Sequence, residues 1–480
     1  MQDEHGLPPE MDIPERGGTP DHEIDGACAI SHREIAVDGA SQHQLEAAGA
    51  TSRREFLRGA AAIATGAAAL SSASCSTILG GGLPTARPRA ALPAGEPVRI
   101  GVIGTGGMGT EHCRALLRLV EAGRINARIV ALSDVCEPRL EAARKEVAEK
   151  QAGLIATHTR YTDLLADPSI HGVLIASPEH WHAKMAEDAI AAGKDVYVEK
   201  PMTLRLPEAL RLREVVRANP GAIVVVGTQY TMIPSYIEAQ RLIAADAIGK
   251  PVTSQTSYCR NSRDGEWLYY EIDSEWRPGV NLDWRGWCGP LGERPWDPAV
   301  YARWRRYRDF STGIIGDLLV HRITPLVMAL DVGWPVRVVA SGGHYIDKAM
   351  QNHDQVNINI DFEGEHTMIV AGSTANELGL ETVIRGHRAN LFVGGRNTVL
   401  RPERIFAEEV EECTIEGADE GDSQDVLRAN WIECIRTRQQ PRSDVELGTR
   451  VMVIVDLATR SMWEGGAFGF NPRTLSVSRL

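Results

Sequence analysis

The sequence predicts an α/β protein with two cores: a domain built on a parallel sheet, followed by a domain with antiparallel strands. Between residues 98 and 226, short apolar runs alternate with segments of helical periodicity, a pattern typical of a buried parallel sheet. Beyond residue 336, apolar and polar residues alternate, as in 355–362, which indicates half-exposed antiparallel strands. The chain has 480 residues, of which 43% are hydrophobic, enough to bury two ordinary cores.

The first apolar run, Val98–Ile103, leads into the sequence G-T-G-G-M-G, and a helical segment over residues 111–120 follows. Gly104 permits a tight turn, Gly106 lets a pyrophosphate approach the backbone, and Gly109 allows close helix packing. This pattern predicts a Rossmann dinucleotide-binding domain; the alternative is a glycine turn that serves packing alone. The residues assigned to the cofactor here are Gly104, Gly106, Gly107, Met108 and Gly109.

A second strand, Ile129–Ser133, ends at Asp134, close to the distance expected for the acid that accepts hydrogen bonds from the adenosine ribose. This carboxylate favours NAD over NADP. Arg139 is near enough in sequence to leave NADP open, and Asp134 could instead cap a helix.

Polar residues also follow the next three strands, Gly172–Ala176, Asp195–Val198 and Ala222–Val226. Because open parallel sheets bind ligands at the carboxyl ends of their strands, we expect these polar residues to lie at the binding edge. Those assigned to the cofactor are Ser177, Pro178, His182, Glu199, Lys200 and Gln229.

Residues 191–201, A-A-G-K-D-V-Y-V-E-K-P, resemble the A-G-K-x-V-x-x-E-K-P stretch of the Gfo/Idh/MocA family, NAD(P)-dependent enzymes of sugars and polyols that include glucose-fructose oxidoreductase and inositol dehydrogenase. The resemblance runs from about Pro97 onward. It implies that Lys200 lies between nicotinamide and substrate, that the Lys200–Pro201 peptide is commonly cis, and that Glu199 helps to position the nucleotide. It also implies a C-terminal α+β domain with an open, mostly antiparallel sheet that often supports homo-oligomers.

Residues 313–321, G-I-I-G-D-L-L-V-H, are similar to the inositol-dehydrogenase form of the family's second motif. Helical spacing of four puts Asp317 and His321 on one face. The resemblance implies that both flank the reacting hydroxyl: His321 would take its proton, Asp317 would orient the imidazole, and Lys200 would polarise the oxygen. Many relatives have D-x-G-x-H instead, so the substrate class is not inherited. Taken alone, the Asp317 and His321 pair could be a helix-surface pair or a capping feature.

A segment rich in aromatic residues and arginine follows residue 257. Flat rings suit the apolar faces of sugars, and Arg and Asn suit hydroxyls or carboxylates, although the same residues could form a packed layer over the sheet or a subunit contact. The residues assigned to the substrate are Tyr230, Asn261, Trp304 and Arg305. The wider set includes Tyr258, Arg260, Trp267, Trp284, Trp287, Trp296, Arg306 and Tyr307.

The sequence predicts a Rossmann domain over residues 97–228 and a substrate and oligomerisation domain over 229–480, which ends in helices at 423–438 and 445–463. The scattered histidines His344, His353, His366 and His387 lack neighbouring ligands at metal-binding spacing and are interpreted as structural, so no metal site is predicted. The formal net charge of -13, with no basic run, argues against a nucleic-acid partner. None of the eight cysteines forms a C-x-x-C pair, and no disulfide is identified.

The first 96 residues are interpreted as three segments: a disordered acidic leader (1–50), a twin-arginine signal region (51–79) and a flexible linker (80–96). In the second, S-R-R-E-F-L-R precedes a weakly apolar stretch, 59–70, that is too short for a membrane span. This predicts export to the periplasm by the twin-arginine machinery; the alternative is a chance arginine pair. Residues 70–75 only faintly resemble a lipoprotein cleavage site, so lipidation of Cys75 is not expected.

Because the periplasm has no obvious soluble NAD pool, we expect a tightly bound nicotinamide cofactor. The sequence therefore predicts hydride transfer between bound NAD, or NADP, and a CH–OH group of a sugar or polyol. One alternative is a redox-neutral, NAD-dependent glycosidase or lyase that oxidises its substrate transiently and then eliminates. The other is a non-catalytic, exported carbohydrate-binding protein.

Overall fold

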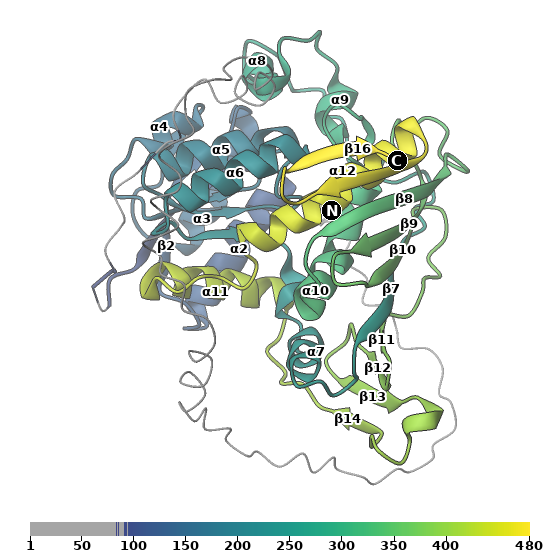
Figure 1. Ribbon diagram of the computed structural model, residues 1–480. Coiled ribbons are helices and arrows are strands. Elements are labelled where there is room, and N and C mark those ends of the chain that lie inside the picture. Colours follow the sequence, from purple (N-terminus) through teal and green to yellow (C-terminus); the bar gives the residue numbers. More distant parts are fainter. Residues whose placement is uncertain (1–82, 84, 86–90, 94) are drawn as a thin grey trace, which may run out of the picture.

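The computed structural model describes residues 83, 85, 91–93 and 95–480, which form two sheets with helices packed on them (Figure 1). The leader, the twin-arginine signal region and Cys75 lie outside the described residues, as does most of the linker. The end of the linker is held in place: Leu92 packs against the core, and the Glu96 backbone carbonyl accepts a hydrogen bond from Arg436.

The first sheet has six parallel strands in the order β3-β2-β1-β4-β5-β6, which confirms the predicted Rossmann-like fold. β4 and β5 are buried along their whole length, since helices cover both faces of the sheet. The strands are β1 (Val98–Ile103), β2 (Ala127–Ser133), β3 (Ala156–His158), β4 (Gly172–Ile175), β5 (Asp195–Val198) and β6 (Val224–Val226). The helices between them are α2 (Gly107–Glu121), α3 (Glu137–Lys150), α4 (Tyr161–Leu165), α5 (Glu179–Ala191) and α6 (Leu206–Ala218).

The second sheet has ten strands in the order β14-β13-β12-β11-β7-β10-β9-β8-β15-β16, and only the β7–β10 pair is parallel. Alternation in β9, where Ile358 and Ile360 are buried and Asn357 and Asn359 exposed, turns one face toward α10 and α12 (Figure 1). The strands are β7 (Pro251–Cys259), β8 (Pro335–Gly343), β9 (Gln355–Phe362), β10 (Thr367–Ser373), β11 (Val383–Gly386), β12 (Ala389–Phe392), β13 (Thr398–Pro402), β14 (Cys413–Ile415), β15 (Ala467–Asn471) and β16 (Ser476–Arg479). The α-helices of this part are α7 (Pro234–Ala244), α8 (Trp284–Cys288), α9 (Pro298–Ala302), α10 (Val320–Leu330), α11 (Ser423–Thr437) and α12 (Val445–Glu464). The short helical turns are η1 (Gln229–Met232), η2 (Gly289–Leu291), η3 (Trp304–Arg306), η4 (Ile315–Leu319) and η5 (Arg404–Phe406).

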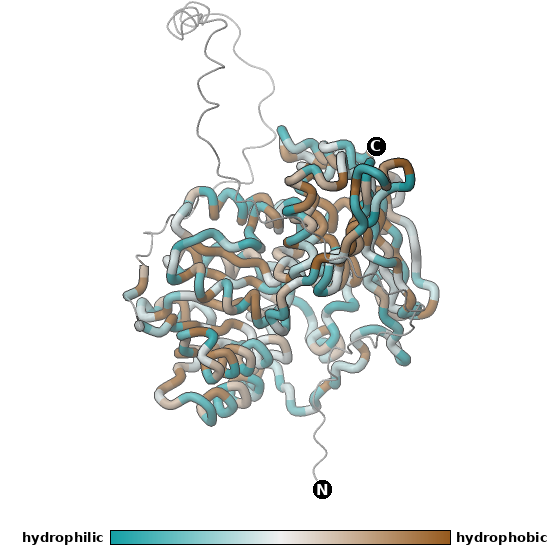
Figure 2. Tube along the Cα trace, turned by 90° about the horizontal axis from the view of Figure 1, so that it is seen from below, coloured by the Kyte–Doolittle hydropathy of each residue, from teal (hydrophilic) through white to brown (hydrophobic). Residues whose placement is uncertain are grey.

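The two C-terminal helices tie the sheets together. The sequence places α11 in the second domain, but its Trp431 and Ile435 belong to the hydrophobic core on the α2 and α3 face of the first sheet. A Cβ at Gly172 of β4 would lie 2.9 Å from atoms of both side chains, so this glycine lets α11 approach the sheet. α12 packs against both α6 and β8. Figure 2 shows hydrophobic stretches running inside both parts of the molecule.

Most of the tryptophans between residues 276 and 304 pack among themselves. Trp284 and Trp287 stack with their ring centroids 4.8 Å apart and are 8% and 5% exposed. They form a separate core with Trp276, Tyr301 and Phe310. For these residues the packing interpretation holds, and their rings are not available to a sugar.

The described residues contain no membrane-spanning helix, no disulfide and no metal-binding cluster. No helix among these residues is both long and apolar enough to cross a membrane. The six cysteines among them are free thiols. Within the same residues, no group of three or more His, Cys, Asp or Glu side chains is arranged to hold a metal ion.

Candidate active site

The glycine turn lies between β1 and α2. Gly104 has φ +87°, and its N–H donates to the Ser133 carbonyl at the end of β2. A Cβ at Gly109 would lie 1.8 Å from the Gly104 carbonyl oxygen, so the turn and the helix can touch only because position 109 has no side chain. A Cβ at Gly106 would meet only Arg139 Nη1, at 3.7 Å. Gly106 is the N-cap of α2 and provides no side-chain cap, which leaves the helix N-terminus open to an anion.

Asp134 supports this turn directly. Its Oδ2 accepts hydrogen bonds from Thr105 N at 2.7 Å and Thr105 Oγ1 at 3.2 Å, and its Oδ1 accepts from Cys136 N at 2.8 Å. A carboxylate has about four acceptor positions, so a ribose hydroxyl can still be accommodated. The Arg139 guanidinium is stacked 4.8 Å from the centroids of both Trp276 and Tyr301.

The residues after β4 and β6 leave two buried polar atoms at the edge of the sheet. Ser177 Oγ and Gln229 Oε1 are buried and have no hydrogen-bond partner among the described residues. His182 is predicted to contact the cofactor, but in the structure its ring contacts backbone carbonyls. Its Nδ1 lies 2.7 Å from the Pro201 carbonyl and its Nε2 lies 2.8 Å from the Ser177 carbonyl. Burial lowers the pKa of His182, so one nitrogen of the neutral ring donates to a carbonyl, and the ring lies between the two loops that carry Ser177 and Pro201.

Glu199 belongs to a buried chain that sequence reasoning missed. Arg428 Nε of α11 donates to His112 Nδ1 at 2.9 Å, and His112 Nε2 donates to Glu199 Oε1 at 2.8 Å. Burial and the neighbouring Arg428 charge lower the pKa of His112, so the imidazole is neutral with its proton on Nε2. Nothing in the sequence pairs His112 with Arg428, because 316 residues separate them.

Lys200 and Asp317 meet at the carboxyl end of β5. Lys200 Nζ donates to the Asp317 carbonyl at 2.8 Å and to Asp317 Oδ1 at 3.1 Å, and Arg305 Nε donates to the same Oδ1 at 2.9 Å. Burial would raise the pKa of Asp317, but Lys200 and Arg305 more than offset this and hold it well below its ordinary value. The Lys200–Pro201 peptide is cis, as the family resemblance implies.

The expectation that Asp317 orients the His321 imidazole is wrong. Residues 315–319 form a π-helical turn before α10, and the Asp317 carboxylate is directed to Lys200 and Arg305. His321 Nδ1 is buried without a hydrogen-bond partner in the described structure. Burial, then the nearby Lys200 charge, lowers the pKa of His321 well below 6.5, so its ring is neutral.

The four predicted substrate residues do not all gather here. Tyr230 lies beside His321, with ring centroids 5.6 Å apart, and Arg305 stacks 4.2 Å from the Trp304 ring while binding Asp317. Asn261 is exposed in a loop that pairs with Ala375, and no contact in the described structure joins it to Lys200 or His321.

A further carboxyl group lies next to this cluster and was not among the predicted residues. Glu179 begins α5 and is 1% exposed, and its Oε1 accepts a hydrogen bond from Ser311 Oγ at 2.6 Å. Burial, and then repulsion by Asp317, raises the pKa of Glu179 to about 8. It therefore carries a proton at neutral pH.

Two family models match the chain. One describes an oxidoreductase family with an NAD-binding Rossmann fold and covers residues 98–228; the other describes the C-terminal α/β domain of that oxidoreductase family and covers 293–468. Together they span more than half of the sequence. The chain belongs to the Gfo/Idh/MocA oxidoreductase family.

Among similar Gfo/Idh/MocA proteins is inositol 2-dehydrogenase 1 of Saccharopolyspora erythraea, 34% identical over 166 residues, which are 35% of this chain and 47% of that protein. Another is scyllo-inositol 2-dehydrogenase (NAD(+)) of Bacillus subtilis, 34% identical over 155 residues, 32% of this chain and 42% of that protein. The matched segment thus spans slightly less than half of these relatives.

Solved structures share the fold. An NAD binding oxidoreductase from Klebsiella pneumoniae has a TM-score of 0.59 and 20% identity, covering 77% of this chain and 96% of that chain. Levoglucosan dehydrogenase in complex with NADH and L-sorbose has a TM-score of 0.60 and 18% identity, covering 78% and 98%.

The first Gfo/Idh/MocA domain of this chain fits its cofactor. The uncapped start of α2 beside Gly106 suits a pyrophosphate, and Asp134 at the end of β2 suits a ribose. The unpartnered Ser177 Oγ and Gln229 Oε1 lie along the same edge of the sheet. The domain is therefore an NAD-binding Rossmann domain. The glycine turn and Lys200 both lie at the carboxyl ends of strands of its sheet.

Proposed function

We propose that this protein is an NAD-dependent oxidoreductase that acts on a CH–OH group of a sugar or polyol. The observation that carries the proposal is the meeting of Lys200 and Asp317, 117 residues apart in sequence, beside a buried, neutral His321 with an unpartnered Nδ1. Burying charged groups beside a base that has no hydrogen-bond partner costs stability. Such an arrangement, with strongly shifted pKa values, is typical of a functional site.

Each side chain has a definite task in this reaction. Two N–H groups of Lys200 are held by Asp317, and the third is available to the hydroxyl oxygen of the substrate. The neutral His321 takes the hydroxyl proton as the carbonyl forms. Arg305 keeps Asp317 ionised and so holds the Lys200 ammonium in place. NAD, when bound, supplies the acceptor for the hydride that leaves the same carbon.

The substrate class and the choice of NAD rest on further support. The curated relatives are named as inositol 2-dehydrogenases, and one solved neighbour as a levoglucosan dehydrogenase, all acting on polyols or sugars by name. Asp134 favours the unphosphorylated ribose of NAD, and the Arg139 guanidinium already lies over the rings of Trp276 and Tyr301. Export through the twin-arginine route remains part of the proposal on sequence alone, and it predicts tight retention of the nucleotide.

The experiment is to purify the protein without added cofactor, release its small molecules, identify any dinucleotide by mass spectrometry, and follow its redox state with a sugar and polyol panel. Stoichiometric NAD whose redox state changes with a panel member supports the proposal. A protein that carries no nucleotide and also ignores added NAD contradicts it.

A further inference from the structure

The charges around Lys200 and His321 do not cancel. Asp317 forms ion pairs with both Lys200, at 3.1 Å, and Arg305, at 2.9 Å. Arg260 pairs with Glu266 at 3.2 Å. Glu199 adds one more negative charge from the buried chain with neutral His112. Protonated Glu179 and neutral His321 add none.

Arg322 is the remaining charge. It follows His321 in α10, and no acidic side chain lies within ion-pair distance of it in the described structure. Counting Lys200, Arg305, Arg260 and Arg322 against Asp317, Glu266 and Glu199 leaves this cluster of side chains with an excess of one positive charge.

The position of Arg322 connects this charge to the site. Its guanidinium carbon lies 4.9 Å from the Tyr230 ring centroid and 5.6 Å from that of Tyr258. The same two rings lie 5.6 and 6.2 Å from the His321 imidazole. Arg322 Nε is buried without a hydrogen-bond partner in the described residues, and a buried guanidinium N–H with no acceptor is costly.

From this geometry we infer that the substrate is a sugar acid whose carboxylate binds Arg322, on the Tyr230 and Tyr258 side of His321. This inference rests on the proposed function and narrows its substrate class. One excess positive charge matches the single charge of a carboxylate, and the planar guanidinium fork matches its two oxygens. Tyr230 and Tyr258 supply flat surfaces for the guanidinium and the sugar.

The test is calorimetric binding of D-glucuronate and D-galacturonate, each compared with its neutral parent, D-glucose or D-galactose, to the protein with its nucleotide. We expect at least one acid to bind 10-fold or more tightly than its parent, since a hydrogen-bonded charge pair contributes about 1.5 kcal/mol or more. Arg322→Met should reduce that ratio to less than about 3-fold, and Arg322→Lys should give an intermediate ratio because it keeps the charge and loses the fork.

The matched control is Arg401→Met. Arg401 also lies over a ring, 4.8 Å from the Phe392 centroid, but it pairs with Glu412 at 3.0 Å on β13, next to the edge strand β14 of the second sheet (Figure 1). Arg401→Met also removes one positive charge, and it should leave the preference for the acid over its neutral parent unchanged. Parents that bind as tightly as the acids, acids that do not bind, or a preference that survives Arg322→Met each overturn the inference. If neutral sugars still change the redox state of bound NAD, the proposed function stands while the inference fails.

Discussion

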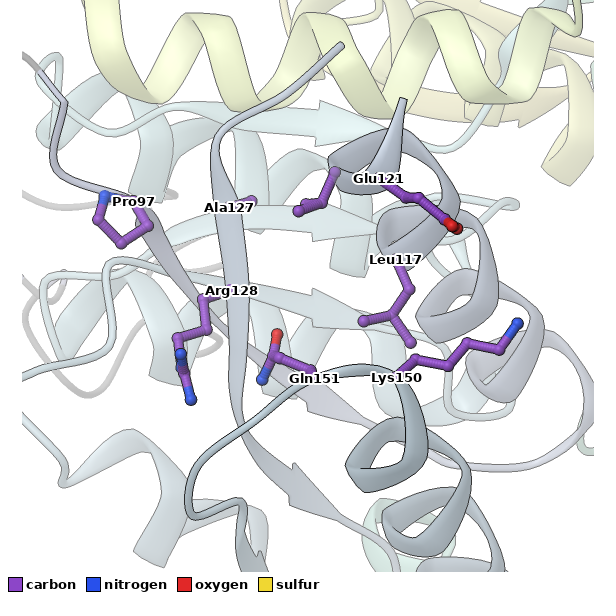
Figure 3. A pocket seen from close by; sticks show the side chains of 8 residues that line it. Pro97, Leu117, Glu121, Ala127, Arg128, Lys150 and Gln151 are labelled. Carbon is purple, nitrogen blue, oxygen red and sulfur yellow. The ribbon is translucent and has the colours of Figure 1, made fainter. Parts of the chain in front are cut away.

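The two edges of the parallel sheet offer different kinds of opening. At the amino edge, a cavity of about 540 Å³ lies between β2 and the ends of α2 and α3 (Figure 3). Two of its polar side chains are hydrogen-bonded to backbone: Gln151 bonds both the N–H and the carbonyl of Ile129, and Arg128 donates to the Ala152 carbonyl. At the carboxyl edge, Ser177, Gln229 and His321 each keep a buried polar atom unpartnered in the described structure. Unsatisfied buried groups, and not the size of a cavity, mark the edge where we place the chemistry.

Removing one side chain at each edge tests whether the two edges differ in function. His321→Ala should lower turnover by about 10²–10⁴-fold, because it removes the base that takes the hydroxyl proton. Gln151→Ala at the amino edge should leave turnover within about 2-fold and cost about 1 kcal/mol of unfolding free energy for its backbone hydrogen bonds. The measurements are the turnover and the urea unfolding of both variants. Equal losses of turnover would mean that the edges do not differ in function.

The glycine turn offers a second, smaller contrast within the carboxyl edge. Gly109→Ala forces a Cβ to 1.8 Å from a backbone oxygen, so it should destabilise the fold by about 1–3 kcal/mol. Gly106→Ala meets only the end of Arg139 at 3.7 Å and should fold normally, but its methyl group should weaken NAD binding by obstructing the backbone approach. Thermal unfolding and NAD titration separate the two effects. A normally stable Gly109→Ala protein would show that turn and helix do not pack as described.

These contrasts show what the sequence could predict. The alternation of buried strands and helices, the glycine turn and the Glu199–Lys200–Pro201 segment are local patterns, and they located the fold and the edge that binds ligands. The partners of Asp317 could not be predicted, because Arg305 comes from a loop and a π-turn changes the helical register. The raised pKa of Glu179 likewise arises from burial, which no local pattern reveals.

Glu179 gives a prediction that depends on pH. Its folded-state pKa of about 8 exceeds its ordinary value of 4.5, so the folded state binds this proton more tightly than the unfolded chain does. Its contribution to stability is therefore fully present below pH 4.5 and is lost as pH rises toward 8, at up to about 1.4 kcal/mol per pH unit. Glu179→Gln keeps the neutral shape and should remove this decline. Unfolding free energies of both proteins from pH 5 to about 8 provide the measurement; parallel curves would contradict a protonated Glu179.

The smallest expected effect concerns the acid limb of the pH–rate profile. Because burial keeps the pKa of His321 well below 6.5, the neutral base persists as pH falls, and activity should decline only below pH 6.5. Steady-state rates measured in overlapping buffers test this. An acid limb centred at or above the ordinary histidine value would show that His321 is not the buried base described here.

The most direct test of the central claim is a single turnover with a substrate that carries deuterium on the reacting carbon, using the sugar or polyol identified in the panel. If Lys200 and His321 serve hydride transfer, mass spectrometry will find one deuterium in the nucleotide released from the wild-type protein, and almost none in that from His321→Ala after the same reaction time. Consumption of the substrate with no deuterium in the nucleotide would contradict the account.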